Sequence, residues 1–296
     1  MIARTAGTQV VEQARAKLRR RVIQRELRAV RSGHGQRVSF AIDERGVDVA
    51  GLLVRATAGL RAETVEMQRL TDALKLSNNL ESMVEGLAGR DVGRRTRSAR
   101  IVGALGLEDA VAWLAPLLAS REGAVTDAAA RALGRIGGVR SAEALLQAIL
   151  RAGPRRILIT ELARGAPDLF VEVVLAAEQR PGVTAAAAVA AGLRRRRTAV
   201  TPLLNLLMTG NRRQRAISCR SLGWIGARDA IPSITLALRD REWRVRVSAA
   251  KALAILRAHA SRPDVEPLLG DRHLKVRMAA VTALRRLDGA GAYAWR

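Results

Sequence analysis

The sequence predicts an all-α protein, a right-handed solenoid of about seven helical hairpins with a helical N-terminal cap. Apolar residues within each segment fall three and four positions apart, as on one face of an amphipathic helix. Hydrophobic residues make up 49% of the 296-residue chain, which is enough for a packed core. A leucine recurs at nearly regular intervals, at Leu105, Leu133, Leu162, Leu193, Leu222, Leu253 and Leu284. Intervals of this length are typical of helical repeats.

The first predicted element is a basic amphipathic helix, or arm, within residues 1–37. This stretch contains 10 basic and 2 acidic residues, a net charge of +8. An apolar stripe is predicted over Thr8 to Val30 from Val11, Ala14, Leu18, Val22 and Leu27. The polar side carries Arg15, Lys17, Arg19, Arg20, Arg21, Arg25 and Arg28. Such a helix suits an anionic membrane surface, and it suits equally a position at the end of the solenoid.

Residues 38–90 are predicted to be a helical cap region. Ser32 to Gln36 interrupt the first helix, and Val38 to Ile42 are either a short strand or extended chain. Residues 50–88 predict two or three helices. Their nearly neutral charge suits a cap that closes one end of a repeat core.

Residues 91–288 are predicted to form the solenoid, and 289–296 a tail. Each repeat begins with an Ala-rich amphipathic helix, which a glycine or polar turn follows. The second helix then opens near a predicted N-cap, at Asp109, Ser141, Asp168 or Asp229. Because one hairpin cannot bury its own apolar face, neighbouring hairpins are expected to stack.

The last repeats carry a resemblance to a known family. The residue pattern that runs from Asp240 through Val245-Arg246 to Leu253 recurs from Asp271 through Val276-Arg277 to Leu284. Together with the turn that begins at Gly226, these strings resemble HEAT repeats of the short, bacterial lyase-like type. The layout is also similar to bacterial HEAT proteins associated with glycosyltransferases, but this chain lacks their membrane span. The resemblance implies a ladder in which Arg215, Arg246 and Arg277 pair with aspartates such as Asp240 and Asp271.

Positive charge is concentrated in the last four repeats. Residues 181–296 contain 22 basic and 7 acidic residues, a net charge of +15, whereas residues 91–180 have a net charge of +3. Equivalent positions one repeat apart should line up along a solenoid and form a basic ridge. The residues of this predicted ridge are Arg194, Arg195, Arg196, Arg197, Arg212, Arg213, Arg239, Arg241, Arg244, Arg272 and Lys275. The charge indicates an acidic partner, or else a solvated face enlarged by GC-rich coding.

The sequence contains few residues that would suit an enzymatic function. Only His34, His259 and His273 are present and none precedes a glutamate, so the His-Glu pairs of HEAT-like di-iron hydroxylases are missing. A HEAT-like DNA glycosylase would need a tryptophan-lined cleft with a carboxylate. Here Trp113, Trp224 and Trp243 are explained by helix packing. Nothing beyond the scaffold suggests a bilin lyase, and Cys219 is predicted to be a core residue. We therefore predict no catalytic residue, no metal site and no cofactor.

The predicted function is that of a non-catalytic scaffold. A protein partner, preferably with an acidic surface, would bind the basic ridge and a concave face lined by the second helices of the hairpins. The alternatives are a peripheral membrane adaptor that uses the N-terminal helix, and a nucleic-acid-binding protein. Every apolar run is too short to span a membrane and no signal peptide is recognisable. A cytoplasmic protein is therefore expected, peripheral at the membrane in the adaptor alternative.

Overall fold

A computed structural model describes residues 2–177 and 180–288, with side chains from residue 11 onward except at 181. The chain forms two compact units, one ending at Leu145 and the other beginning at Leu146. The predicted tail, 289–296, lies outside the described residues. None of the described helices is both long enough and apolar enough to cross a lipid bilayer.

The first unit contains the N-terminal helices and the first repeats. Its elements are α1 (Ile2–Ser32), α2 (Val49–Ala56), α3 (Val65–Lys75), α4 (Asn79–Ala88), α5 (Val92–Ala104), η1 (Glu108–Ala110), α6 (Val111–Leu117) and α7 (Gly123–Ile136). Helix α8 (Gly138–Ala152) contains the unit boundary. Two or three helices were expected over residues 50–88, and α2, α3 and α4 occupy this stretch. Residues 38–42 were expected as a strand or extended chain. Residues 38–41 have no regular secondary structure, Ile42 begins a turn, and no strand occurs among the described residues.

The second unit consists of the remaining hairpins. Its elements are α9 (Arg156–Gly165), α10 (Asp168–Ala176), α11 (Pro181–Leu193), η2 (Arg197–Ala199), α12 (Val200–Thr209), α13 (Arg212–Ile225), η3 (Arg228–Ala230), α14 (Ile231–Leu236), η4 (Ala237–Arg239), α15 (Trp243–Leu256), η5 (His259–Ser261), α16 (Arg262–Val265), η6 (Glu266–Gly270) and α17 (Leu274–Leu287). The predicted all-α solenoid of stacked hairpins is thereby confirmed.

Helix α1 packs on α2 and α3 through a different stripe from the one predicted. Ile23, Leu27 and Val30 are buried, whereas Val11, Leu18 and Val22 are exposed. Of the predicted stripe only Leu27 lies in the core. The prediction missed the true stripe because two apolar stripes run along this helix, and only tertiary contacts select between them.

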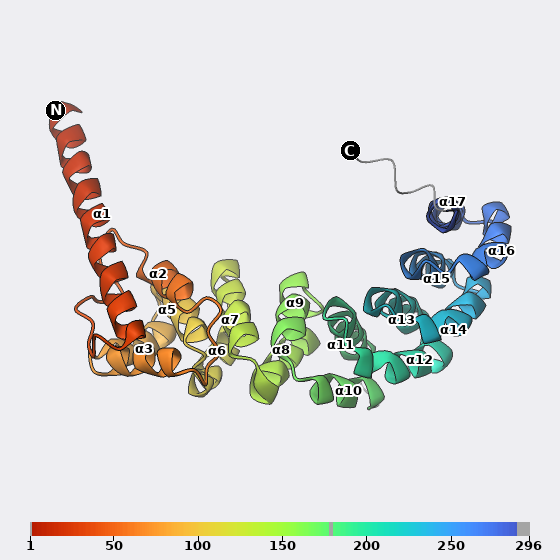
Figure 1. The fold of residues 1–296 in the computed structure, drawn as a ribbon, viewed down its shortest axis with the longest axis horizontal. Helices are drawn as coiled ribbons and strands as arrows, with labels where there is room; N and C mark the ends of the chain where they lie inside the picture. The colour runs from red at the N-terminus through yellow and green to blue at the C-terminus, as the bar shows by residue number, and fades with distance from the viewer. Residues whose placement is uncertain (1, 178–179, 289–296) are drawn as a thin grey trace. The chain divides into compact units, whose positions relative to one another are not determined.

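In the second unit the first helices of the hairpins form one layer and the second helices form the other. Helices α11, α13, α15 and α17 stack in succession, and α10, α12, α14 and α16 lie beside them (Figure 1). Within this unit the first helices occupy the inner side of the curve. The expectation that second helices line the concave face is therefore wrong for this unit.

The repeat is regular in the second unit. Arg195, Gly226 and Arg257 each adopt the left-handed conformation just after a first helix, and the same interval of one repeat separates each from the next. This register makes Ala191, not Leu193, the equivalent of Leu222. Ala191 is fully buried and Leu193 is 48% exposed, so the assignment of Leu193 to the repeating leucine was wrong.

Asp168 is the first residue of α10, but no side chain caps that helix, and the other three predicted caps do not lie at the start of a second helix. Asp109 and Asp229 lie inside short 3₁₀ helices, and Ser141 lies within α8. A 3₁₀ turn in front of a second helix bonds its own backbone, as in the bond from Ala230 N–H to the carbonyl of Ala227. Because that turn already satisfies the backbone donors, a side-chain cap is not needed there.

Adjacent repeats are joined by the ladder that the family resemblance implied. Arg215 donates through Nε and Nη2 to the two carboxylate oxygens of Asp240, at 2.7 and 2.9 Å. Arg246 binds Asp271 in the same way at the same distances. These bidentate pairs connect each first helix to the loop before the next one. Arg215, Arg246 and their aspartates therefore serve the stacking of repeats.

Candidate functional site

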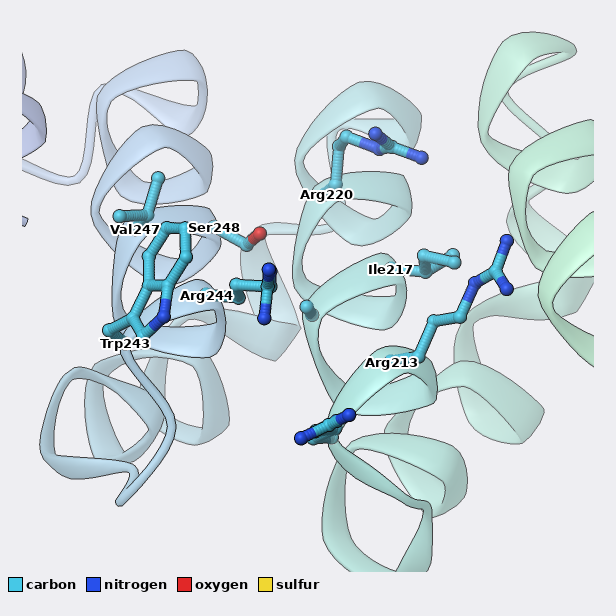
Figure 2. Close-up of a pocket in the computed structure, with 9 residues that line it drawn as sticks. Arg213, Ile217, Arg220, Trp243, Arg244, Val247 and Ser248 are labelled. Carbon is cyan, nitrogen blue, oxygen red and sulfur yellow. The ribbon is translucent and has the colours of Figure 1, made fainter. Parts of the chain in front are cut away.

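The candidate site is a groove between α13 and α15, on the inner side of the second unit. It encloses a volume of about 600 Å³. The residues that line it, shown in Figure 2, are Arg212, Arg213, Ala216, Ile217 and Arg220 from α13 and Trp243, Arg244, Val247 and Ser248 from α15. Four arginines thus surround a small apolar floor.

Trp243 organises the cations on the α15 side of the groove. Its ring stacks on the imidazole of His273, with ring centroids 4.0 Å apart and an angle of 10° between the planes. The guanidinium carbon of Arg244 lies 4.6 Å from the indole centroid, and the Lys275 ammonium lies 5.3 Å from it. A guanidinium stacked on an aromatic ring keeps its in-plane N–H donors free for an anion. Trp243 therefore holds two cations in place without occupying their hydrogen bonds.

Arg220 provides a second cation–aromatic contact, on α13. Its guanidinium carbon lies 4.9 Å from the ring centroid of Trp224. Its side chain still reaches solvent, but partial burial lowers the pKa of the guanidinium. In the part of the chain that the structure describes, no carboxylate pairs with Arg212, Arg213, Arg220 or Arg244. The groove therefore carries uncompensated positive charge.

The positive groups lie on both sides of α13. Figure 2 shows Arg244 in the space between α15 and α13, whereas the head group of Arg213 extends from the far side of α13. Ala216, Ile217 and Val247 form the apolar surface of the groove. A ligand that meets both Arg213 and Arg244 must therefore cross α13, which suits an extended segment better than a compact ion.

Family membership follows from the sequence of the whole chain. A family model described as HEAT repeats matches residues 80–164, 170–254 and 231–295, which together exceed half of the chain. The protein belongs to the HEAT-repeat family. The comparison with curated proteins found no significant match.

Several solved structures are similar to this HEAT-repeat protein over most of its length. Human deoxyhypusine hydroxylase in complex with glycerol is 16% identical over 95% of this chain and 99% of its own, with a TM-score of 0.38. A designed armadillo repeat protein is 17% identical over 70% of this chain and 99% of its own, with a TM-score of 0.34. Kap121p is 15% identical over 83% of this chain but only 33% of its own, with a TM-score of 0.40. At these TM-scores the superpositions carry no argument about fold, activity or partners.

The HEAT-repeat structure does not place the eleven predicted ridge residues on one surface. Arg212, Arg213 and Arg244 line the groove, and Lys275 adjoins it through Trp243. Arg239 and Arg241 line a separate hollow of about 420 Å³ beside the Arg215–Asp240 pair. Of the remaining exposed ridge residues, Arg197 begins η2, and the others lie in loops that flank first helices, namely Arg194, Arg195 and Arg272.

Arg196 does not belong to any exposed surface, and its prediction as a contact residue was wrong. Its side chain is buried, and it donates to the carbonyls of Ala163, Ala166 and Pro167 at the end of α9. Its Nε lies 2.8 Å from an oxygen of Asp168. Burial lowers the pKa of this guanidinium, and the Asp168 carboxylate offsets part of the effect. Arg196 therefore closes the end of a helix from the next repeat.

Sequence reasoning missed two groove residues. Trp243 was attributed to repeat packing, although it is only half-buried and stacks across a repeat boundary. Arg220 was not assigned to the ridge, yet it lies two helical turns after Arg213 and so on the same helix face. That spacing was the available signal. Trp113, assigned to a core stripe, is exposed, and Trp224 is half-buried beneath Arg220.

The basic residues of α1 form a separate cationic surface in the first unit. Six of the predicted basic residues are exposed, namely Arg15, Lys17, Arg20, Arg21, Arg25 and Arg28. The seventh, Arg19, is half-buried and pairs with Glu44 at 3.0 Å. The hydrogen bond to Glu44 raises the pKa of Arg19. The exposed stripe of Val11, Leu18 and Val22 runs between several of these cations.

The potential catalytic groups of the second unit serve structural purposes. The Asp240 carboxylate is held by Arg215. Burial opposes its ionisation, but the hydrogen bonds from Arg215 and from the Glu242 N–H lower its pKa overall. Cys219 is buried, as predicted, and burial raises its thiol pKa to about 12. Among the described residues, no three His, Cys, Asp or Glu side chains are grouped as metal ligands would be.

Proposed function

We propose that this HEAT-repeat protein is a non-catalytic scaffold that captures an extended acidic segment of a partner protein in the α13–α15 groove. The observation that carries the proposal is the set of four groove arginines without carboxylate partners. Uncompensated guanidinium groups attract carboxylates over a distance and bind them through paired hydrogen bonds. Trp243 adds to this by holding Arg244 and Lys275 in place before the ligand arrives.

The surroundings of the arginines favour a protein ligand over a nucleic acid. One face of the Trp243 ring stacks on His273, and two cations lie over the ring, so the ring is occupied where a nucleobase would stack. The groove floor of Ala216, Ile217 and Val247 suits aliphatic side chains. An extended peptide that alternates acidic and aliphatic residues would meet both features.

The proposal is tested with a fluorescein-labelled peptide rich in glutamate and leucine, measured by fluorescence anisotropy. Replacing Arg213→Gln and Arg244→Gln together should weaken binding about tenfold or more, because each removes a charge-assisted hydrogen bond. The matched control replaces Arg228→Gln and Arg239→Gln, which removes the same charge from the second-helix layer, and it should bind nearly as before.

Two further probes define the ligand class. The same peptide with glutamine at every glutamate should bind poorly, and a single-stranded oligonucleotide should not displace the acidic peptide efficiently. Equal losses in the groove variant and the control variant would mean that binding follows net charge alone, and the groove would then not be the site. Efficient displacement by the oligonucleotide would favour a nucleic-acid ligand instead.

A second candidate function is attachment to an anionic membrane surface through α1. The exposure of Val11, Leu18 and Val22 beside exposed arginines favours it, since such a stripe can lie in the lipid headgroup region. Co-sedimentation with phosphatidylserine vesicles should fall several-fold for Leu18→Asp and stay unchanged for Leu236→Asp, an exposed leucine of the second unit. Equal sedimentation of the two variants would exclude this role.

A further inference from the structure

Helix α17 carries an exposed apolar stripe at the end of the first-helix layer (Figure 1). Leu274, Met278 and Val281 are 58%, 61% and 39% exposed and lie four and three residues apart, on one face of the helix. In the preceding repeat the equivalent of Val281 is Ala250, which is fully buried. Helix α17 packs against α15 and covers that repeat. On α17 itself Val281 is uncovered among the described residues, while Leu274 and Met278 are equivalent to the half-buried groove residues Trp243 and Val247.

Arg277 is the next arginine of the ladder, and no carboxylate in the described part of the chain pairs with it. Its Nη1 donates to the carbonyl of Asp271 at 2.9 Å, as Nη1 of Arg246 donates to the carbonyl of Asp240 at 2.7 Å. In Arg246 the remaining edge, Nε and Nη2, binds Asp271. Across residues 11–177 and 180–288, no carboxylate pairs with that edge of Arg277. Arg277 is thus held by the same backbone contact as Arg246, with its bidentate edge free.

Arg285 limits which helix can cover this face. It is equivalent to Gly223 and Ala254, and the small residue at Gly223 permits close contact, because a Cβ there would lie 3.0 Å from the Cα of Ala252. Arg285 is exposed, large and charged. A covering helix that leaves room at this end and carries an acidic residue there fits Arg285 better than one with a small or basic residue in that place.

The geometry points to a second docking surface on α17, one that accepts an acidic amphipathic helix of a partner protein. An aspartate just before the partner helix binds Arg277, as Asp271 binds Arg246. Apolar residues of that helix cover Met278 and Val281, and an acidic residue two to three turns later meets Arg285. None of the residues of this surface lines the groove between α13 and α15, so the two surfaces are separate.

The probe is a peptide of residues 271–287, the segment that makes the equivalent contact with Arg246. It carries Arg272→Glu, Lys275→Glu, Arg285→Glu and Arg286→Glu, and a hydrocarbon staple on its outer face keeps it helical, as circular dichroism verifies. Isothermal titration calorimetry with the full chain measures the affinity. We expect saturable one-to-one binding that weakens about tenfold to a hundredfold when the peptide carries Asp271→Asn.

Two variants of the protein test the surface from its other side. Arg277→Gln and Val281→Glu should each weaken binding by about tenfold or more, while Arg228→Gln, far from α17, should leave it unchanged. Val281 makes no contact that the solenoid needs, so Val281→Glu keeps the test valid if Arg277→Gln alters stability. Absence of binding, or equal affinity of the Asp271→Asn peptide, overturns the proposal.

The same variants separate this surface from the groove. The glutamate- and leucine-rich probe should bind the Arg277→Gln protein with unchanged affinity if the groove is an independent site. If the wild-type protein does not bind the glutamate- and leucine-rich probe but does bind the helical peptide, the proposed function is refuted and the α17 surface is not. The reverse outcome would refute the α17 surface alone.

Discussion

The ladder pair of Arg246 and Asp271 permits a quantitative test of how the repeats are held together. The two side chains are each 9% exposed and form a bidentate pair, and Arg246 also donates to the carbonyls of Asp240 and Arg241. Replacing Arg246→Met would leave the Asp271 carboxylate covered but unpaired. Removing one partner of a buried pair costs about 3 to 5 kcal/mol. Because this pair lies near the molecular surface, we expect a loss of about 3 kcal/mol.

The assay is urea unfolding followed by circular dichroism, with Arg246→Met, Asp271→Asn and the double variant compared in one cycle. Asn keeps the oxygen that accepts the His273 N–H, so the cycle isolates the ion pair. We expect the double variant to lose less than the sum of the single variants, because no unpaired charge remains. Arg262→Met is the control, since its pair with Asp288 is about half exposed and should contribute little. Additive losses, or equal losses in Arg246→Met and Arg262→Met, would refute the reasoning.

Three further predictions concern the core and its charges. The hydrogen bonds from Arg246 are the largest cause that lowers the pKa of Asp271 below its usual 3.8, so the stabilisation by this pair should persist above pH ~4 and be lost in acid. Thermal unfolding across pH should therefore show that the difference in melting temperature between wild type and Arg246→Met becomes smaller below that pH. A difference that stays constant with pH would contradict the prediction. Cys219, with a thiol pKa of about 12, should resist iodoacetamide in the native protein and react with it in urea. Mass spectrometry measures the extent of labelling. Rapid labelling of the native protein would contradict the burial of this thiol. A Cβ at Gly103 would collide with the backbone of Ala132 on α7, so Gly103→Ala should lower the free energy of unfolding by about 1 to 3 kcal/mol. A Cβ at Gly123 would have no atom within 4 Å, so Gly123→Ala should not destabilise the protein. Similar melting temperatures for the two variants would argue against close helix contact at Gly103.

Much of the architecture could be predicted because HEAT repeats use the same local pattern many times. The family resemblance implied that Arg215 and Arg246 pair with Asp240 and Asp271, and the structure confirms both pairs. The predicted repeat register was wrong in one helix, where the residue type suggested the wrong position. Leu193 was taken for the repeating leucine, although its helix uses Ala191 in that place. An alanine-rich helix offers many small residues that can fill the same site, so composition alone cannot fix the register.

The candidate site was predicted only in part. Arg212, Arg213 and Arg244 were expected on an exposed edge and do line the groove. The role of Trp243 could not be predicted, because its stacking on His273 depends on how closely two helices approach across a repeat boundary. An apolar residue at a helix start suits core packing as well as a groove wall, and sequence does not separate the two.

By itself the sequence determined that this chain is a stack of amphipathic helix pairs with a positively charged C-terminal half. Periodicity and charge are properties of the chain order, so they can be read without coordinates. Only the tertiary structure decided which of four consecutive arginines, Arg194 to Arg197, is buried, and which layer of helices forms the inner side of the second unit. Both depend on the backbone conformation at each turn. Gly226 is a residue type that favours the left-handed conformation, but Arg195 and Arg257 adopt it as well although their residue type does not predict it.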